Sequence, residues 1–342
     1  MKRSNNKNQI LFLLLALAVT VLFLLNLFVG AVDIPFGEVL SIISGGECER
    51  EAWKMIVLET RLPQAVTALL TGAAISVAGL LLQTLFNNPL AGPEVLGINS
   101  GAGLGVAVVM LLAQGLFVVN GMGVAGYIAV FAGAFVGAAI IIAVILLFST
   151  ILKNKVFLLI VGVAVGYLAS SLITVLNYFA TAEGVHSYLV WGMGSFSAVS
   201  IEQLPLYSGL VLFLLLLSLL MMKPLNALLL GDAYAHNLGV NVKMVRNVLL
   251  AVVGLLSAVV TAFCGPIAFI GLAVPHMARM LLNSNNHKIL LPGTLLFGAL
   301  TALACNIVCQ LPGESGLLPL AAITPLIGAP VIIYVVLKNR NI

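Results

Sequence analysis

Residues 61–101 read RLPQAVTALLTGAAISVAGLLLQTLFNNPLAGPEVLGINSG, and this stretch decides the fold. It opens with an apolar segment, Pro63–Phe86, that has no charged residue and is long enough to cross a bilayer as a helix. The helix breaks at Asn87-Asn88-Pro89, and the chain continues as a glycine-rich apolar run. A simple lipid anchor has no need of such a break, so the pattern indicates a helix pair that lines a pathway.

The composition of the whole chain supports this interpretation. Apolar residues make up 62% of the 342 residues and charged residues only 8%, against about a quarter in soluble domains. The apolar segments are too long and too uniform for the short alternating strands of a β-barrel. We therefore expect an all-α polytopic membrane protein. The scarcity of charge also argues against a nucleic-acid binder.

Ten apolar segments are predicted to be membrane spans. No soluble domain interrupts them, so residues 1–342 are predicted to form a single transmembrane domain. The first segment follows a basic start but is too long for a signal peptide, and we keep it as a span. The ten lie at Ile10–Val32, Pro63–Phe86, Leu96–Leu112, Ala125–Leu152, Val156–Ala180, Leu204–Met222, Val248–Phe263, Ile267–Leu282, Ile289–Val308 and Leu317–Leu337.

The basic residues predict the orientation. Ten spans place both termini on one side of the membrane, and 12 of the 15 Lys and Arg residues fall on that side. The other three are Arg50, Lys54 and Arg61. The positive-inside rule makes the side with twelve cations cytoplasmic. Of the 11 acidic residues, only Glu94 and Asp232 fall there.

Two connecting segments stand out by their length. The external loop, residues 33–61, carries nine charges in 29 residues. The cytoplasmic loop, residues 223–246, contains GDAYAHNLG at 231–239. Asp232 is a candidate N-cap there and Gly239 a candidate stop, so this loop is predicted to hold a short helix at the membrane face.

Residues that could carry chemistry are few. The chain has no phosphate-binding loop and neither an H-E-x-x-H nor a C-x-x-C motif, so we expect no ATP hydrolysis, metal site or cofactor. Arg279 is the one charged residue in the ten predicted spans, so no ion-coupling site is visible. The cysteines predict no disulfide framework. The chain is therefore either a passive pore or is driven by a docked partner.

Six ordered segments resemble one known family. They are RLP at 61–63, GAAISVAGLLLQTLFNNPLAGPEVLGINSGAGLG at 72–105, WGMGSF at 191–196, FIGLAVPHMAR at 269–279, LLPG at 290–293 and TPLIGAP at 324–330. Over residues 10–338 the chain resembles the FecCD-type permeases of binding-protein-dependent ABC importers for iron chelates, haem and cobalamin. The resemblance implies the type II importer permease fold and a homodimer of ten-span subunits. It also implies two cytoplasmic ATPase subunits, which bind ATP and Mg, and a periplasmic or lipid-anchored substrate-binding protein.

The resemblance also implies roles for particular residues. The cytoplasmic gate is expected at Asn88, Pro89 and Leu90 and at Asn154, Lys155 and Val156, and ATPase coupling at Gly231, Asp232, Ala235 and Gly239. Arg50, Lys54 and Arg61 are expected to dock the binding protein by charge complementarity. Neutralisation of the six acids in the same loop is the alternative, and it is stronger for Arg50 and Lys54 than for Arg61. Gln64 and Gln310 stand where the family often has further external arginines.

Four residues near the predicted external mouth are candidates to line the pathway, with interfacial anchoring as the alternative role. They are Asn177, Tyr178, Trp191 and Met193. Together these observations favour a permease of the bacterial inner membrane that imports an iron chelate, either a siderophore or haem. Cobalamin is the second cargo, and a stand-alone channel or secondary carrier is the competing class.

Overall fold

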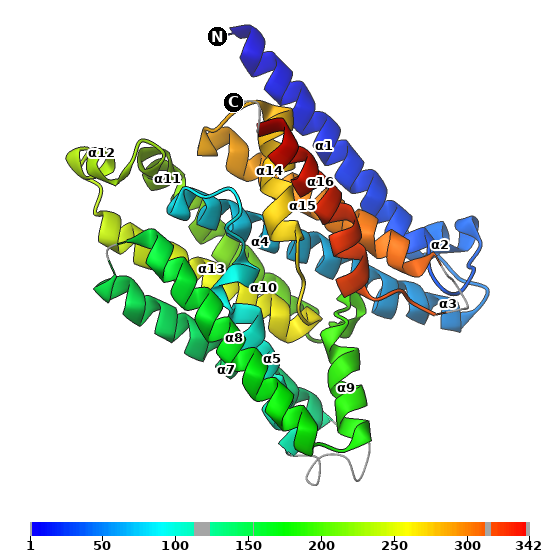
Figure 1. Cartoon of the computed structure of the whole chain (residues 1–342). Coiled ribbons are helices and arrows are strands. Elements are labelled where there is room, and N and C mark those ends of the chain that lie inside the picture. The colour runs from blue at the N-terminus through cyan, green and yellow to red at the C-terminus, as the bar shows by residue number, and fades with distance from the viewer. Residues whose placement is uncertain (1, 113–123, 153, 312–315, 340–342) are drawn as a thin grey trace.

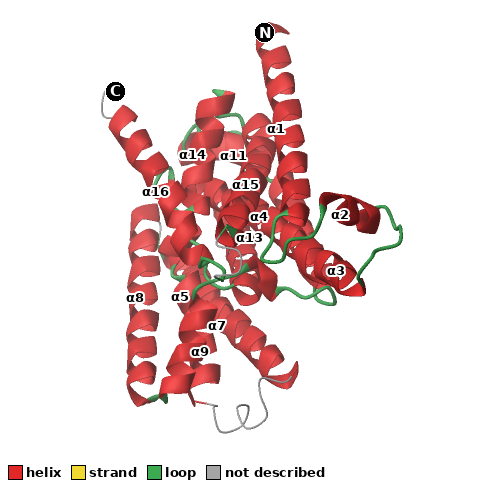
Figure 2. Cartoon of the chain, turned by 90° about the vertical axis from the view of Figure 1, so that its right-hand side faces the viewer, coloured by secondary structure: helices red, strands yellow, loops and turns green. Residues whose placement is uncertain are grey.

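The computed structural model describes residues 2–112, 124–152, 154–311 and 316–339, and every regular element in these ranges is helical (Figures 1 and 2). The all-α prediction is therefore confirmed. The elements are α1 (Lys2–Phe28), α2 (Phe36–Ile43), α3 (Glu51–Met55), η1 (Ile56–Arg61), α4 (Leu62–Phe86), η2 (Pro93–Leu96), α5 (Ile98–Ala107), η3 (Val108–Leu112), α7 (Val124–Ile151), α8 (Lys155–Phe179), α9 (Ala182–Gly192), η4 (Phe196–Ala198), α10 (Leu204–Leu220), α11 (Met222–Leu228), α12 (Asp232–Asn237), α13 (Val242–Cys264), α14 (Ile270–Leu282), α15 (His287–Gln310) and α16 (Leu320–Asn339).

The apolar helices correspond one to one with the predicted spans. Within the described ranges, six helices are long and apolar enough to cross a membrane, and α10 and α11 form a seventh, bent by 51°. Three further apolar helices are shorter: Ile98–Leu112, Ile270–Leu282 and Leu320–Tyr334. All three begin later than predicted, and in two of them Gly97 or Phe269 adopts a positive φ angle directly before the helix. Lys153, Glu314 and Arg340, which entered the charge count, lie outside the described residues.

Helix α4 forms the centre of the bundle. A Cβ atom on Gly72 would lie 2.1 Å from the carbonyl oxygen of Gly298 in α15, and one on Gly79 would lie 1.7 Å from that of Gly271 in α14. Such close backbone approach is what small residues allow in membrane helices. The glycines of α4 therefore hold α14 and α15 directly against it.

Glycines at four-residue spacing form a second contact, between α5 and α7. A Cβ on Gly105 would lie 1.8 Å from the carbonyl oxygen of Gly133, and one on Gly137 would lie 2.1 Å from that of Gly101. Gly162 and Gly166 of α8 pack against the chain at Leu96 and Gly97. The helices α5, α7 and α8 thus form a layer beside α4.

The two ends of the bundle differ. Both termini lie at one end, together with α11 and α12, whereas α2, α3 and α9 lie at the other (Figures 1 and 2). We call the first the basic end and the second the acidic end. The exposed acids of the acidic end are Asp33, Glu47, Glu49, Glu51, Glu59, Glu183 and Glu202.

Candidate functional site

The turn after α4 is built by a cap at the end of the helix. Asn87 adopts the left-handed conformation with φ 47°, and the N–H of Asn88 donates to the carbonyl of Gln83 at 3.1 Å. This is the pattern by which many helices end. The Asn88 side chain then accepts a hydrogen bond from the N–H of Leu90 at 2.9 Å. Leu90 is left exposed at the surface of the turn.

The turn before α8 uses the same side-chain bond. Asn154 is the N-cap of α8, and its Oδ1 accepts from the N–H of Val156 at 2.8 Å. An Asn at this position satisfies an N–H that has no partner within the helix. Each of the two predicted gate segments therefore contains an Asn that bonds the N–H two residues further on. Val156, like Leu90, is exposed.

The short helix α12 forms at the predicted place in the loop 223–246. It is bounded by Gly231 and Gly239, whose φ angles of +98° and +82° favour glycine. The N–H of Val240 bonds the carbonyl of Ala235, and the N–H of Gly239 bonds that of His236, so Gly239 ends the helix as predicted. The predicted N-cap is wrong, because Gly231 occupies that position and Asp232 is the first helical residue.

The surface around α12 is unusually apolar. Within α12 only Ala235 is buried. Four large apolar side chains of the segment are exposed: Leu229, Leu230, Tyr234 and Leu238. An apolar projection at the end of the bundle suits contact with another protein.

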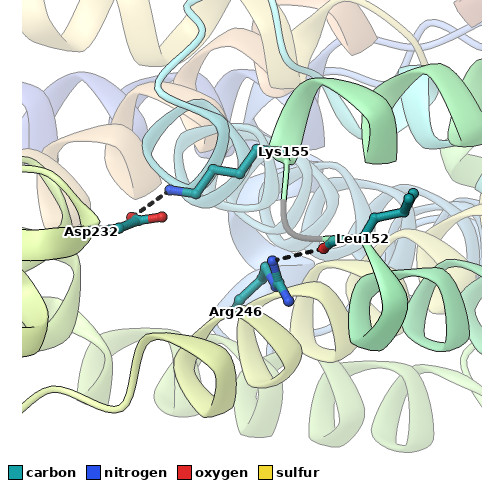
Figure 3. A network of polar contacts seen from close by, with 4 residues as sticks. All are labelled: Leu152, Lys155, Asp232 and Arg246. Carbon is teal, nitrogen blue, oxygen red and sulfur yellow. Dashed lines mark hydrogen bonds and ion pairs between the residues drawn. The ribbon is translucent and has the colours of Figure 1, made fainter.

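Figure 3 shows how α12 reaches the turn before α8. Lys155 Nζ lies 2.7 Å from Asp232 Oδ1. Arg246, on the first turns of α13, donates to the carbonyls of Ser149 and Leu152 at the end of α7. The structure therefore brings a predicted gate residue and a predicted coupling residue into contact. Sequence reasoning did not predict this contact, because Arg246 lies near the start of α13 and meets the end of α7 only in the folded chain.

The turn after α4 is held by α14 instead. His276 Nε2 lies 2.8 Å from the carbonyl oxygen of Pro89. Arg279 donates to Gln83 Oε1 at 2.6 Å, and Gln83 Nε2 donates to the carbonyl of Leu272 at 3.1 Å. The charge of Arg279, noted from the sequence as an exception, is thus used to fix the last turn of α4.

A pocket that the sequence did not predict lies between η2, the start of α5 and α8. Its volume is about 230 Å³. Burial raises the pKa of the Glu94 carboxyl at its edge, against the opposing effect of the backbone N–H groups of Glu94 and Phe269. The rest of its lining carries no charged side chain: Val95, Gly97, Ser100, Gly162, Val163, Gly166, Tyr167 and Ser170. Among the described residues, those that line the pocket include no His, no Cys and no acid besides Glu94.

At the acidic end, the three predicted docking cations differ in exposure: one is buried and two are exposed. Arg61 is 3% exposed, and its guanidinium donates to the carbonyls of Leu27 and Phe28 at the end of α1 and of Val32 after it. In this structure the Arg61 charge is turned inward onto α1, and docking by Arg61 stays a prediction. Arg50 and Lys54 are exposed, and Arg50 lies 4.9 Å from the centre of the Trp53 ring. Docking by these two stays a prediction.

The two glutamines that depart from the family pattern are buried. Gln64 donates to Asn306 at 3.0 Å, and Asn306 donates to Asn26 at 2.7 Å, so three helices share one polar network. Gln310 is 4% exposed. Neither glutamine presents its side chain at the surface in this structure.

The four predicted pathway residues do not gather in one place. Asn177 and Tyr178 lie at the end of α8, where Tyr178 is 84% exposed. Trp191 lies at the far end of α9, roughly 16 Å further along an 11-residue helix, and stacks near Tyr188 with ring centres 6.0 Å apart. Met193 follows it directly. Their role as pathway residues stays a prediction.

Among the described residues, no group of three or more His, Cys, Asp or Glu side chains is arranged to hold a metal ion. The candidate site consists of the turn after α4, the turn before α8 and the projecting helix α12, all at the basic end. These parts suit a protein that moves in response to a partner.

Comparison with known proteins gives one consistent family. The model of the FecCD transport family matches residues 17–338. The vitamin B12 import system permease protein BtuC of Escherichia coli O9:H4 is 37% identical over 299 residues, covering 87% of this chain and 89% of that protein. The BtuC protein of Salmonella typhi is 35% identical over 340 residues, covering 99% and 98%. A solved structure described as an inward-facing conformation of a metal-chelate type ABC transporter has a TM-score of 0.83 and 28% identity, covering 96% of this chain and 99% of its own.

Proposed function

The chain belongs to the FecCD transport family and is a permease of a binding-protein-dependent ABC importer, and we propose that its cargo is cobalamin. It is a transport subunit without an ATPase site of its own. It is an integral protein of the bacterial inner membrane. These statements favour the importer permease over the competing class, a stand-alone channel or secondary carrier.

The choice of cargo reverses the order that the sequence alone favoured. Relatives named as vitamin B12 permeases match up to 99% of the chain at 35–37% identity. The metal-chelate transporter matches at 28%. Cobalamin is itself a chelate of cobalt, so the two descriptions agree in chemistry. An iron chelate, either a siderophore or haem, becomes the second candidate.

The ATPase contact is assigned to α12 at the basic end. The observation that supports it is the apolar projection around α12, which carries exposed Tyr234 and Leu238 while Ala235 is buried. This projection lies beside the turn before α8 through the pair of Lys155 and Asp232. Movement of α12 by an ATPase subunit would therefore reach that turn directly. This assignment makes the basic end cytoplasmic, with both termini inside.

A second copy of the chain is proposed to cover α8. This helix exposes a run of large apolar residues, among them Tyr167 at 74% and Leu168 at 62%. A homodimer would place this face, and the pocket at Glu94, toward the pathway between the copies. On this proposal residues 1–342 act as one permease domain, and the acidic end receives the binding protein.

The cargo is tested on the complex of this chain with its ATPase subunits and its substrate-binding protein in proteoliposomes. Cyanocobalamin is expected to stimulate ATP hydrolysis and to enter the vesicles, while haem and a ferric hydroxamate have weaker effects. Stronger stimulation by either iron chelate would overturn the cargo but leave the importer class intact. Uptake by this chain alone would overturn the class.

A further inference from the structure

A buried histidine at the start of α15 joins three helices at the basic end. His287 Nε2 lies 2.8 Å from Thr84 Oγ1 on the last turn of α4. His287 Nδ1 lies 2.9 Å from Asn226 Oδ1 on α11. His287 is 1% exposed and Thr84 4%. Neither residue belongs to the predicted gate or coupling sets, but Thr84 lies four residues before the gate residue Asn88.

The hydrogen bonds fix the direction of this chain of contacts. Asn226 Oδ1 also accepts the backbone N–H of His287 at 2.8 Å, and Asn226 Nδ2 donates to Asn286 Oδ1 at 2.9 Å. The oxygen of Asn226 therefore faces the ring, so Nδ1 of a neutral His287 carries the proton and donates it. Nε2 is then an acceptor, and the single proton of the Thr84 hydroxyl is shared between it and the carbonyl oxygen of Leu80, 3.0 Å away. Every polar atom of the ring has a partner.

The two ends of this chain of contacts lie close to the turn after α4 and to α12. Thr84 is three residues before Asn87, and its carbonyl accepts the N–H of Asn87 at 3.3 Å. Asn226 is two residues before the end of α11, and only residues 229–231 separate α11 from α12. A displacement of α12 has a short route through α11 to the turn after α4.

The first turn of α15 is itself able to pivot. Pro292 lies inside α15 and has no N–H, so it makes no helical bond to the carbonyl of Lys288. The turn that carries His287 is thus less firmly joined to the rest of α15. Because the ring is enclosed, it moves with its neighbours and does not turn into solvent.

We propose that His287 is a positioning residue that transmits movement of α11 and α12 to the gate turn after α4. The inference rests on the proposed function, because that function assigns α12 to the ATPase. Without the ring, ATP hydrolysis continues but the turn after α4 no longer follows α12. The physical requirement is that the turn has two arrangements and that the bonds to His287 favour one of them.

The test measures coupling, which a merely structural role would not change. The ratio of cyanocobalamin imported to ATP hydrolysed is measured in proteoliposomes that hold the full complex. Thr84→Val and His287→Asn each remove the bond between α4 and the ring, and each is expected to lower the ratio about fivefold or more. Thr84→Ser keeps the hydroxyl and is expected to keep the ratio.

Thr71→Val is the matched control. Thr71 is on the same helix, is fully buried, and loses a hydroxyl bond to Tyr207 of 2.7 Å. Thr71 lies more than three helical turns from the gate turn. The Thr71→Val protein is therefore expected to be less stable but to keep the wild-type ratio of cyanocobalamin imported to ATP hydrolysed. An unchanged ratio in Thr84→Val and His287→Asn, or an equal fall in Thr71→Val, would overturn the proposal. If the Thr84→Val complex does not assemble, Asn226→Ala takes its place. Asn226 is half-buried at the other end of this chain of contacts, and its loss is expected to lower the same ratio.

Failure of the cargo proposal is recognised separately. A wild-type complex that does not import cyanocobalamin counts against cobalamin and not against His287. In that case the readout is labelling of a cysteine at the exposed Leu90 position, Leu90→Cys, with and without ATP. His287 transmits movement if the ATP-dependent change in labelling disappears with His287→Asn, and it does not if the change persists.

Discussion

Helices α4 and α8 have the same length and each adjoins a turn with the same side-chain bond, but their surroundings are opposite. All but three of the 25 residues of α4 are buried, against four of the 25 in α8. The turn after α4 is tied to neighbouring helices by buried bonds from His276 and Thr84. The turn before α8 is tied to α12 by a partly exposed ion pair.

The difference teaches that two similar turns can receive the same movement through unlike connections. A buried hydrogen bond in a close-packed site transmits a shift without being weakened by solvent. A surface ion pair is screened by salt and is worth little in free energy. We therefore expect the two turns to respond differently when each connection is altered.

The largest effect on uptake is expected from a change in α12, because the proposed connections to both turns start there. Gly239→Arg places a side chain at φ +82°, a conformation that costs an L-residue about 1–2 kcal/mol. The end of α12 is expected to shift, so that the ATPase subunits no longer co-purify and uptake stops. Gly45→Arg is the control, because Gly45 has φ +79° and equally open space at the acidic end. Retained co-purification in Gly239→Arg would contradict the assignment of α12.

The next effect compares the packing of the two helices directly. Gly79→Ala in α4 would bring a Cβ within 1.7 Å of the Gly271 carbonyl, and backbone cannot make way cheaply. We expect a loss of about 1–3 kcal/mol in stability. Gly166→Ala in α8 has its nearest contact at 3.1 Å, so its loss is smaller. Thermal unfolding of the purified protein measures both, and equal shifts would show that α8 is as tightly packed as α4.

A smaller effect is expected from removing the Asn of each turn. Asn154→Ala loses the N-cap of α8, which is worth about 1 kcal/mol. Asn88→Ala loses one side-chain bond, but the turn keeps its backbone cap and the contact of His276 with Pro89. Hydrogen exchange is therefore expected to rise more at the amide of Val156 than at that of Leu90. The opposite order would mean that the turn after α4 is the looser one.

The smallest effect is expected from the ion pair. Lys155→Gln removes a contact whose partners are 19% and 47% exposed, so stability falls by about 1 kcal/mol or less. Uptake by the wild-type complex is expected to weaken between about 0.1 M and 1 M salt, as the Debye length shortens. The exchange of charges in Lys155→Asp with Asp232→Lys is expected to restore uptake. If Lys155→Gln leaves both the rate and the salt dependence unchanged, the pair does not connect α12 with α8.

The sequence predicted the helices well because membrane spans depend on length and apolarity, which are local properties. It also located α12 and the turn after α4, since the Asn-Pro break and the glycines that bound α12 act within a few residues. The turn before α8 was expected from the family resemblance. It did not predict which span is central. The mean hydropathy of α8 is 2.4 and that of the span containing α4 is 2.1, because lipid-facing and buried surfaces are equally apolar.

The residues that sequence reasoning missed act over long separations. Thr84 and His287 are 203 positions apart, and Ser149 and Arg246 are 97. The burial of Arg61 was not predicted for the same reason, since its position at the external end of a span does not reveal the carbonyls of α1 behind it. A single sequence has no local pattern that records such pairs.

The central claim is that the two turns are connected to α12 by different contacts. The most direct test labels Leu90→Cys and Val156→Cys, one at a time, in the assembled complex with and without ATP. The native cysteines Cys264, Cys305 and Cys309 are buried and Cys48 lies at the acidic end. Labelling of the chain without an added cysteine is therefore the background that is subtracted. In the His287→Asn background, ATP is predicted to change the labelling of the cysteine at position 156 but not of that at position 90. In the Asp232→Asn background, ATP is predicted to change the labelling at position 90 but not at position 156. An unchanged response to ATP at both positions in both variants would contradict the account.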